Sequence, residues 1–124
     1  MRLYLDTNVI VDILDDRDPS SASLFLRALS CEHTLILSDL LFRELQNIGF
    51  HEEGNTIVQE LRHNKKVSFV APTDEELIAA RRLPTHAADA LHYVLAVRYA
   101  DALVTRNIKD FPFTGILIRK PEYV

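Results

Sequence analysis

The chain has 124 residues, a length that fits one domain spanning residues 1–124. Hydrophobic residues make up 48% of it and charged residues 26%, which excludes disordered and fibrous chains because both values are typical of folded proteins. The formal net charge is −4, so the chain lacks the broad basic surface of proteins that bind nucleic acids regardless of sequence. A phosphate-bearing substrate would have to be held locally. Either metal ions offset some of the carboxylates, or the ligand is not a nucleic acid.

The cysteine and histidine content excludes further classes of protein. The single cysteine, Cys31, cannot form an internal disulfide, which favours a reducing compartment. The histidines have no cysteine partners with which to form a zinc cluster. No apolar run approaches the roughly 20 residues of a membrane span. We therefore expect a soluble, cytoplasmic protein that does not enter a membrane.

Short apolar runs alternate with amphipathic stretches along the chain. Apolar runs bounded by polar residues predict strands, and apolar residues spaced three or four apart predict helices. The predicted strands are residues 2–5, 35–37, 67–70, 102–105 and 116–118. The predicted helices are residues 8–14, 19 to about 29, 39 to about 48, 52–63, 74 to about 83 and 86 to about 100.

Residues that favour helix starts precede most of the predicted helices. Thr7, Ser38 and Thr85 are each expected to be the N-cap of the helix that follows. Asp18 is expected to cap a helix that begins with a proline, a residue suited to the first helical position. Thr73 begins a capping box, in which a glutamate follows three residues later.

This alternation of strands and helices predicts an α/β fold. We expect a three-layer α/β/α arrangement around a mainly parallel sheet of about four to five strands, covered by helices on both faces. Ligands of such sheets bind beyond the carboxyl ends of the strands. The places to look for a site are therefore Asp6, Ser38, Thr73 and the residues after Thr105.

Three acidic residues fall on faces that should be buried. Asp6 directly follows a strand whose neighbours are apolar. Helical periodicity places Glu44 within the apolar stripe of its helix. Asp89 is the single acid on a helix, residues 86–100, that is apolar nearly all round. Acids are almost never fully buried without partners, so these three need an explanation.

Two explanations are compatible with the residues. Each acid could have its own hydrogen bond or ion pair, such as Asp89 with His86 or His92 one helical turn away. Alternatively, one divalent cation shared by Asp6, Glu44 and Asp89 would satisfy all three together. A set of oxygen ligands without cysteine favours Mg²⁺ or Mn²⁺ over zinc.

Four motifs occur in order along the chain: LYLDTNVIVDIL, SDLLFREL, HAADALHYVLAV and ALVTRNIKDF. With this order and spacing, the chain resembles the PIN-domain nucleases, in particular the small single-domain toxin ribonucleases of the VapC type. The resemblance implies a PIN-like fold with an acidic pocket that binds Mg²⁺ or Mn²⁺ and cuts single-stranded RNA. By resemblance, Asp6, Glu44 and Asp89 are the catalytic, metal-binding acids. An antitoxin protein is the implied partner, and we expect a homodimer.

The family's fourth acidic position departs from the pattern. It lies two residues after Thr105, where this chain has Asn107, which offers a carbonyl oxygen to a metal but no charge. Asp110, three residues further on, is the other candidate metal ligand. We favour a turn-forming role for Asp110, because Phe111 and Pro112 follow it.

Polar and basic residues near the same strand ends are candidate substrate ligands. Thr7, Asn8 and Thr105 are expected to hydrogen-bond the metal ligands or a substrate phosphate. Arg106 and Lys109 follow a strand end and are expected to bind the RNA backbone.

Two other α/β families also place an acid after the first strand. A haloacid-dehalogenase-type phosphatase needs a second aspartate where this chain has Asn8. A response-regulator receiver needs an acid pair after the first strand and an aspartate ending the third. Here Asp6 stands alone, and residues 67–70 run into Ala71. The sequence therefore disfavours both families.

Two alternatives remain open within the PIN-like reading. A metal-free ribonuclease would use His86 and His92 as general acid and base. The closer alternative is a PIN-like domain that binds RNA or a protein without cutting, which the uncharged Asn107 favours.

Overall fold

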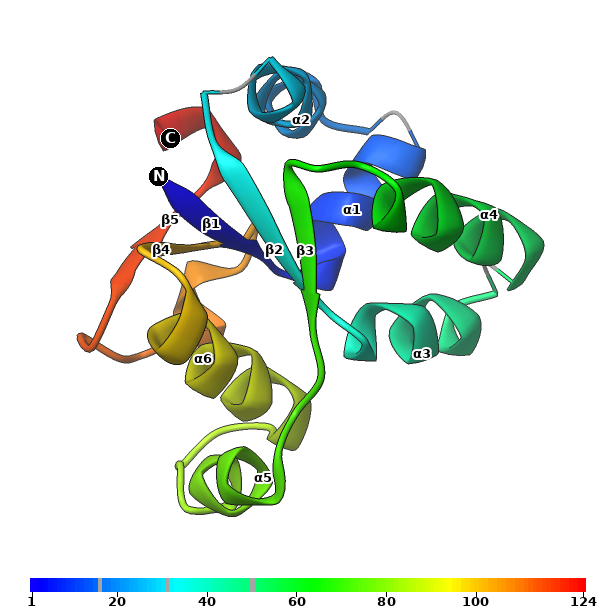
Figure 1. Ribbon diagram of the computed structural model, residues 1–124. Coiled ribbons are helices and arrows are strands. Elements are labelled where there is room, and N and C mark those ends of the chain that lie inside the picture. Colours follow the sequence, from blue (N-terminus) through cyan, green and yellow to red (C-terminus); the bar gives the residue numbers. More distant parts are fainter. Residues whose placement is uncertain (16, 31, 50) are drawn as a thin grey trace.

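The structure is a computed structural model that describes residues 1–15, 17–30, 32–49 and 51–124. Cys31, on which the expected absence of a disulfide depends, lies outside the described residues. The strands form one sheet, in which all neighbours are parallel, in the order β3-β2-β1-β4-β5 (Figure 1). The strands are β1 (Arg2–Leu5), β2 (Thr34–Ser38), β3 (Val67–Val70), β4 (Ala102–Val104) and β5 (Leu117–Arg119).

Helices cover both faces of the sheet, as Figure 1 shows. On one face lie α1 (Thr7–Leu14), α2 (Pro19–Leu29), α3 (Leu40–Asn47) and α4 (His51–Arg62). On the other lie α5 (Asp74–Arg81) and α6 (Ala87–Tyr99). Two short 3-10 helices, η1 (Ile108–Asp110) and η2 (Pro121–Tyr123), flank β5. The predicted three-layer α/β/α fold with a mainly parallel sheet is confirmed.

The two faces of β1 belong to different hydrophobic cores. Leu3 and Leu5 pack with the α1–α4 layer, whereas Tyr4 packs with the α5–α6 layer. All three side chains are buried, because a parallel sheet between two helical layers has no face in water. This explains why the strand reads as an almost continuous apolar run.

The central place of β1 determines where polar side chains gather. Because β1 lies between β2 and β4, the carboxyl ends of these three strands meet at one edge of the sheet. Asp6 follows β1, Ser38 ends β2, and Thr105 follows β4. The last two strands differ slightly from the predicted ranges. β4 stops at Val104, one residue early, and β5 begins at Leu117, one residue late.

The predicted N-cap of α1 is wrong. Asp6, not Thr7, is the N-cap, and its Oδ1 accepts a 2.7 Å hydrogen bond from the Thr7 backbone N–H. Thr7 lies inside the helix, and its hydroxyl donates to Glu44 at 2.9 Å. An acidic residue therefore both ends the central strand and begins the helix.

The predicted N-cap of α6 is wrong in the same way. His86, not Thr85, is the cap, and its Nδ1 accepts a 3.4 Å hydrogen bond from the backbone N–H of Ala88. The Thr85 hydroxyl instead donates to the carbonyl oxygen of Asp110 at 3.3 Å. The Thr85 side chain, which the local pattern assigned to capping, therefore makes a long-range hydrogen bond instead.

Two other predicted helix starts are confirmed. Asp18 caps α2 ahead of Pro19, and Thr73 and Glu76 form the capping box of α5. The predicted N-cap of α3 is wrong, because Asp39, not Ser38, occupies that position. The Ser38 hydroxyl still accepts a 3.1 Å hydrogen bond from the backbone N–H of Leu40 at the start of α3. Within the described residues, no helix combines the length and apolar character that crossing a bilayer requires.

Two leucines of α2 allow a matched test of this packing. Leu24 is fully buried between α2 and the sheet, whereas Leu26 is 64% exposed. Leu24→Ala should lower the free energy of unfolding by about 2–5 kcal/mol, because it leaves a cavity in the core. Leu26→Ala should change it by less than about 0.5 kcal/mol. Urea unfolding measures both, and equal losses would contradict the placement of Leu24.

Candidate functional site

Polar residues from several elements line a cavity of about 340 Å³ at the carboxyl edge of the sheet. Asp6 comes from the end of β1, Glu44 from α3, and Asp89 from the first turn of α6. Asn107 and Asp110 come from the loop after β4. All the predicted metal ligands therefore meet here. The full lining is Asp6, Thr7, Asn8, Val11, Asp12, Arg17, Glu44, Ile48, Asp89, Asn107 and Asp110.

Asp6 is the most deeply buried of these acids, with 6% of its surface exposed. Besides the bond from the Thr7 backbone, its Oδ2 accepts a 2.9 Å hydrogen bond from the Thr105 hydroxyl. Burial raises the pKa of Asp6, and the charge of His92 and the Thr105 hydrogen bond only partly oppose this effect. The protein thus holds the Asp6 carboxylate in place at a cost in free energy.

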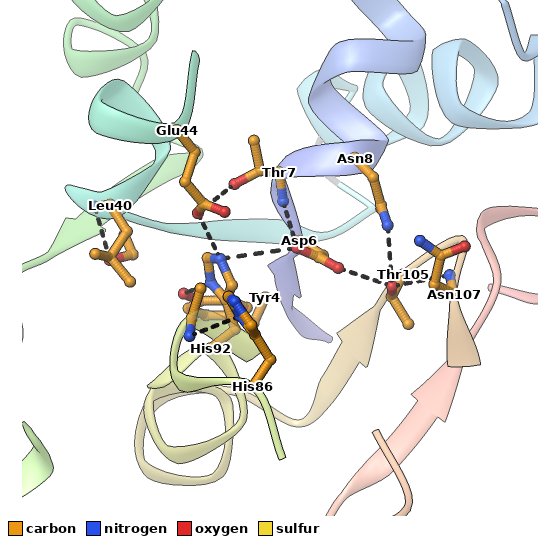
Figure 2. Close-up of polar contacts among 12 residues, drawn as sticks. Tyr4, Asp6, Thr7, Asn8, Leu40, Glu44, His86, His92, Thr105 and Asn107 are labelled. Carbon is orange, nitrogen blue, oxygen red and sulfur yellow. Dashed lines mark hydrogen bonds and ion pairs between the residues drawn. The ribbon is translucent and has the colours of Figure 1, made fainter. Parts of the chain in front are cut away.

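Glu44 has hydrogen-bond partners on two other helices, α1 and α6. Its Oε1 accepts a 2.9 Å hydrogen bond from the Thr7 hydroxyl and lies 2.7 Å from Nε2 of His92 (Figure 2). Burial acts to raise the pKa of Glu44, but the hydrogen bond and charge of His92 and the bond from Thr7 outweigh it, so the pKa is lowered. Glu44 is therefore stabilised as a carboxylate, unlike Asp6.

His92 lies at the centre of this acidic cluster. Only 1% of its surface is exposed, and Nε2 is 3.7 Å from Asp6 Oδ1 as well as close to Glu44. Its Nδ1 is 2.6 Å from the hydroxyl of Tyr4. Burial acts to lower the pKa of His92, but Glu44 and the charge of Asp6 raise it overall. The sequence suggested His92 as a partner of Asp89, whereas its hydrogen bond goes to Glu44.

Asp89 has the least support from the protein. It is partly buried, and among the described residues no side chain or backbone group donates a hydrogen bond to its carboxylate. Burial and the neighbouring charges of Asp6 and Asp110 raise the pKa of Asp89. The charge of Asp89 is therefore disfavoured in this cavity.

Two residues are candidates for the fourth acidic position. Asn107 and Asp110 both line the cavity. Asp110 is also part of a turn, since it ends η1 and its backbone N–H donates to the Asn107 carbonyl at 3.0 Å. The turn-forming and cavity-lining roles of Asp110 are thus not exclusive alternatives.

The predicted substrate ligands divide into two groups. Thr7 and Asn8 line the cavity, but Thr105 is fully buried beneath it and bonds Asp6. Asn8 also accepts a 3.2 Å hydrogen bond from the Arg106 backbone N–H. Lys109 is exposed on η1 and is not part of the lining.

The Arg106 side chain is occupied by carboxylates. Its guanidinium lies 3.4 Å from Asp12, 3.1 Å from Asp18 and 2.9 Å from Glu122. These partners come from α1, the N-cap of α2 and the C-terminal η2. The guanidinium that the sequence assigned to RNA is therefore engaged within the protein.

Sequence reasoning missed several residues of the site. Asp12, inside the first of the four motifs, and Arg17, outside all of them, line the cavity but are not among the predicted site residues. The sequence offers His92 only as a partner of Asp89 or as a general acid–base residue, and Tyr4 only as part of a strand. The useful signal is the Asp89–His92 spacing of three, which places the imidazole on the same face of α6 as Asp89.

The donor set fits a hard divalent cation. Carboxylate and amide oxygens from Asp6, Glu44, Asp89, Asn107 and Asp110 are the ligands that Mg²⁺ and Mn²⁺ prefer. Within the part of the chain that the structure describes, no three histidine, cysteine or acidic side chains already stand in a metal-holding arrangement. Glu44 and Asp6 are instead held by protein hydrogen bonds.

The sequence model of one protein family, the PIN domain, matches residues 3–113 of this chain. The chain belongs to the PIN domain family. The resemblance seen in the four motifs is therefore confirmed, and the cavity lies where those motifs meet. A comparison with curated proteins found no match to this PIN domain.

Three solved structures are similar to this PIN domain along nearly the whole chain. A VapBC2 complex of Rickettsia felis bound to a promoter DNA fragment has a TM-score of 0.72 and 19% identity, and covers 97% of this chain and 98% of its own. DNA-bound VapBC of Salmonella typhimurium has a TM-score of 0.72 and 17% identity, with 98% of both chains covered. VapBC-1 of nontypeable Haemophilus influenzae has a TM-score of 0.67 and 19% identity, again with 98% of both covered. At these identities the similarity establishes the fold.

The opposite pKa shifts of Glu44 and Asp89 predict opposite effects on stability. The raised pKa of Asp89 means that its ionisation favours the unfolded chain, so stability falls as pH rises from the unfolded to the folded pKa. Asp89→Asn should keep or raise the melting temperature at pH 7. The lowered pKa of Glu44 contributes stability above its unfolded pKa, which is lost as pH falls through the folded pKa.

Glu44→Gln should therefore destabilise the protein at pH 7, by about 1.5–3 kcal/mol for a charged hydrogen-bonding group. Thermal unfolding in EDTA at pH 7 measures both variants without metal. Repeating it below about pH 4, near the ordinary pKa of glutamate, should shrink the deficit of Glu44→Gln. A lower melting temperature for both variants would mean that each carboxylate has its own structural partner.

Proposed function

We propose that residues 1–124 act as a single PIN domain that cuts single-stranded RNA in a divalent-metal-dependent reaction. The supporting observation is the cavity in which Asp6, Glu44 and Asp89 converge. Asp6 and Asp89 have raised pKa values because burial and neighbouring carboxylates disfavour their charges. A cation bound between them would relieve this repulsion, which gives the metal a reason to bind.

Asp6, Glu44 and Asp89 would hold Mg²⁺ or Mn²⁺, with Asn107 and Asp110 as further oxygen ligands. When bound, such an ion polarises a phosphodiester and lowers the pKa of a coordinated water. The chain's own groups keep the ligands in place: the Thr7 backbone and Thr105 hydroxyl fix Asp6.

Substrate binding uses the residues at the cavity rim. Thr7 and Asn8 line the cavity and offer polar groups to a phosphate. Lys109 is exposed on the loop after β4, where it can contact the RNA backbone. Arg106 contributes through its backbone, which holds Asn8, since three carboxylates occupy its guanidinium.

We also propose that the chain is the toxin of a toxin–antitoxin pair in the cytoplasm. Its fold matches three VapBC complexes. An antitoxin would block the acidic cavity with an arginine or lysine, because opposite charges favour such a contact. Arg17 also lines the cavity, but its guanidinium pairs with Asp15 at 2.7 Å.

Cleavage of RNA tests the proposed reaction directly. The purified chain should cut single-stranded RNA with Mg²⁺ or Mn²⁺, and excess EDTA should stop it, because the acids alone supply no Lewis acid. Gel analysis of a labelled RNA measures both conditions. Undiminished cleavage in EDTA would contradict the metal mechanism and favour one that uses His86.

Matched aspartate variants separate the site from general effects. Asp89→Asn should lower cleavage on the order of 10²-fold or more. Asp101→Asn, at the opposite edge of the sheet beside Arg2, should leave cleavage unchanged. RNA binding without cleavage by the wild-type chain would favour the non-cutting PIN-like domain, the alternative that Asn107 supports.

We propose a homodimer formed through the outer face of α5. Leu77 and Ile78 are 37% and 49% exposed there, and Leu77 borders an apolar groove of about 360 Å³ shared with Leu40 and Leu91. A second copy would remove this surface from water. In light scattering, Ile78→Glu should give a monomer, whereas Leu26→Glu on α2 should keep the dimer. A monomeric wild-type chain would contradict this proposal.

A further inference from the structure

Two buried side chains that the proposed reaction does not use lie directly behind Glu44. His92 on α6 is 1% exposed, and Tyr4 on β1 is fully buried. They form a chain of contacts, since the Tyr4 hydroxyl is 2.6 Å from Nδ1 of His92 and Nε2 of His92 is 2.7 Å from Glu44 (Figure 2). The two rings also meet edge to face, with centroids 5.6 Å apart. The sheet and α6 thus support a residue of α3.

The direction of the His92 bond follows from the chemistry of its partner. An ionised carboxylate can only accept hydrogen bonds, so Nε2 of His92 carries the hydrogen and donates it to Glu44. The imidazole is then oriented by what its other nitrogen contacts, and that group is the Tyr4 hydroxyl.

Both donors to Glu44 act on the same oxygen. The Thr7 hydroxyl and His92 Nε2 each bond Oε1, at 2.9 and 2.7 Å. Among the described residues, no group hydrogen-bonds Oε2. A carboxylate fixed through one oxygen presents the other to a ligand in one orientation, which reduces the entropy lost when the ligand binds.

His92 also lies between two carboxylates. Its Nε2 is 3.7 Å from Asp6 Oδ1, so a single N–H group faces both Asp6 and Glu44. Without this donor, Glu44 would be held by Thr7 alone, at a rim position where 30% of its side chain is exposed. A flexible glutamate side chain would then sample other rotamers.

We propose that His92 is a positioning residue that orients Glu44 for a divalent cation, and that Tyr4 fixes the His92 ring. The effect on cleavage rests on the proposed nuclease function, whereas the effect on cation binding can be measured without it. His92 is not a catalytic residue, because its burial keeps it from the substrate.

Mn²⁺ binding to the purified full chain, measured by titration calorimetry, tests this role. His92→Leu introduces an apolar side chain of similar volume and removes the hydrogen-bond donor, so it should weaken Mn²⁺ binding about 10–100-fold. His92→Gln retains an N–H donor and should recover most of the loss. His63→Leu is the matched control, since His63 is exposed at the end of α4, and it should bind Mn²⁺ like the wild type.

Tyr4→Phe provides a second test if His92→Leu does not fold. It keeps the buried aromatic ring and removes only the hydroxyl, so it should weaken Mn²⁺ binding by several-fold while thermal unfolding in EDTA shows a folded chain. Wild-type affinity in both His92→Leu and Tyr4→Phe would overturn the positioning role. Equal losses in His92→Leu and His92→Gln would also overturn it, because the donor would then be irrelevant.

The proposed nuclease function fails in a different way. A wild-type chain that binds Mn²⁺ with the expected variant pattern but cuts no RNA would overturn the nuclease and support the positioning of Glu44. RNA cleavage by the wild type, together with unchanged Mn²⁺ affinity in the His92 variants, would support the nuclease and overturn the positioning of Glu44. A wild-type chain that binds no Mn²⁺ would overturn both.

Discussion

The crowding of carboxylates at one edge of a parallel sheet is the constraint on which the site depends. Because β1 is the central strand, the residue after it is surrounded by protein, and that residue is Asp6. A buried carboxylate needs donors, and Thr105 and the Thr7 backbone supply them from neighbouring elements. The loop after β4 and the start of α1 are therefore organised around a charge that the fold itself disfavours. Cation binding would offset that penalty.

The acids could be predicted from local patterns, but their partners could not. An acid after a buried strand identified Asp6, and helical periodicity identified Glu44, because both signals depend only on nearby residues. The His92–Glu44 bond joins residues 48 apart in the sequence, and it exists because α3 and α6 approach the same strand end from opposite faces of the sheet. Spacing along α6 could relate His92 only to Asp89.

Long-range contacts also explain why two of the predicted caps are wrong. Thr7 and Thr85 are suited to capping, but each hydroxyl bonds a residue of a distant element, Glu44 and Asp110 respectively. Side chains with several possible partners cannot be assigned from sequence alone, whereas the α5 capping box needs only its own first turn and was predicted correctly. The fold could be predicted more completely than the site. Alternating strands and helices recur along the whole chain, whereas the site depends on individual contacts between distant residues.

The ion pairs of Arg106 make the site sensitive to ionic strength. Because this side chain is 34% exposed, dissolved salt weakens its ion pairs with Asp12, Asp18 and Glu122. Its backbone holds Asn8 and precedes Asn107, which lines the cavity. Salt would thus loosen the loop at the same time as it weakens the phosphate contacts of the proposed RNA substrate. Affinity for that proposed substrate should therefore fall with salt more steeply than the number of bound phosphates alone implies.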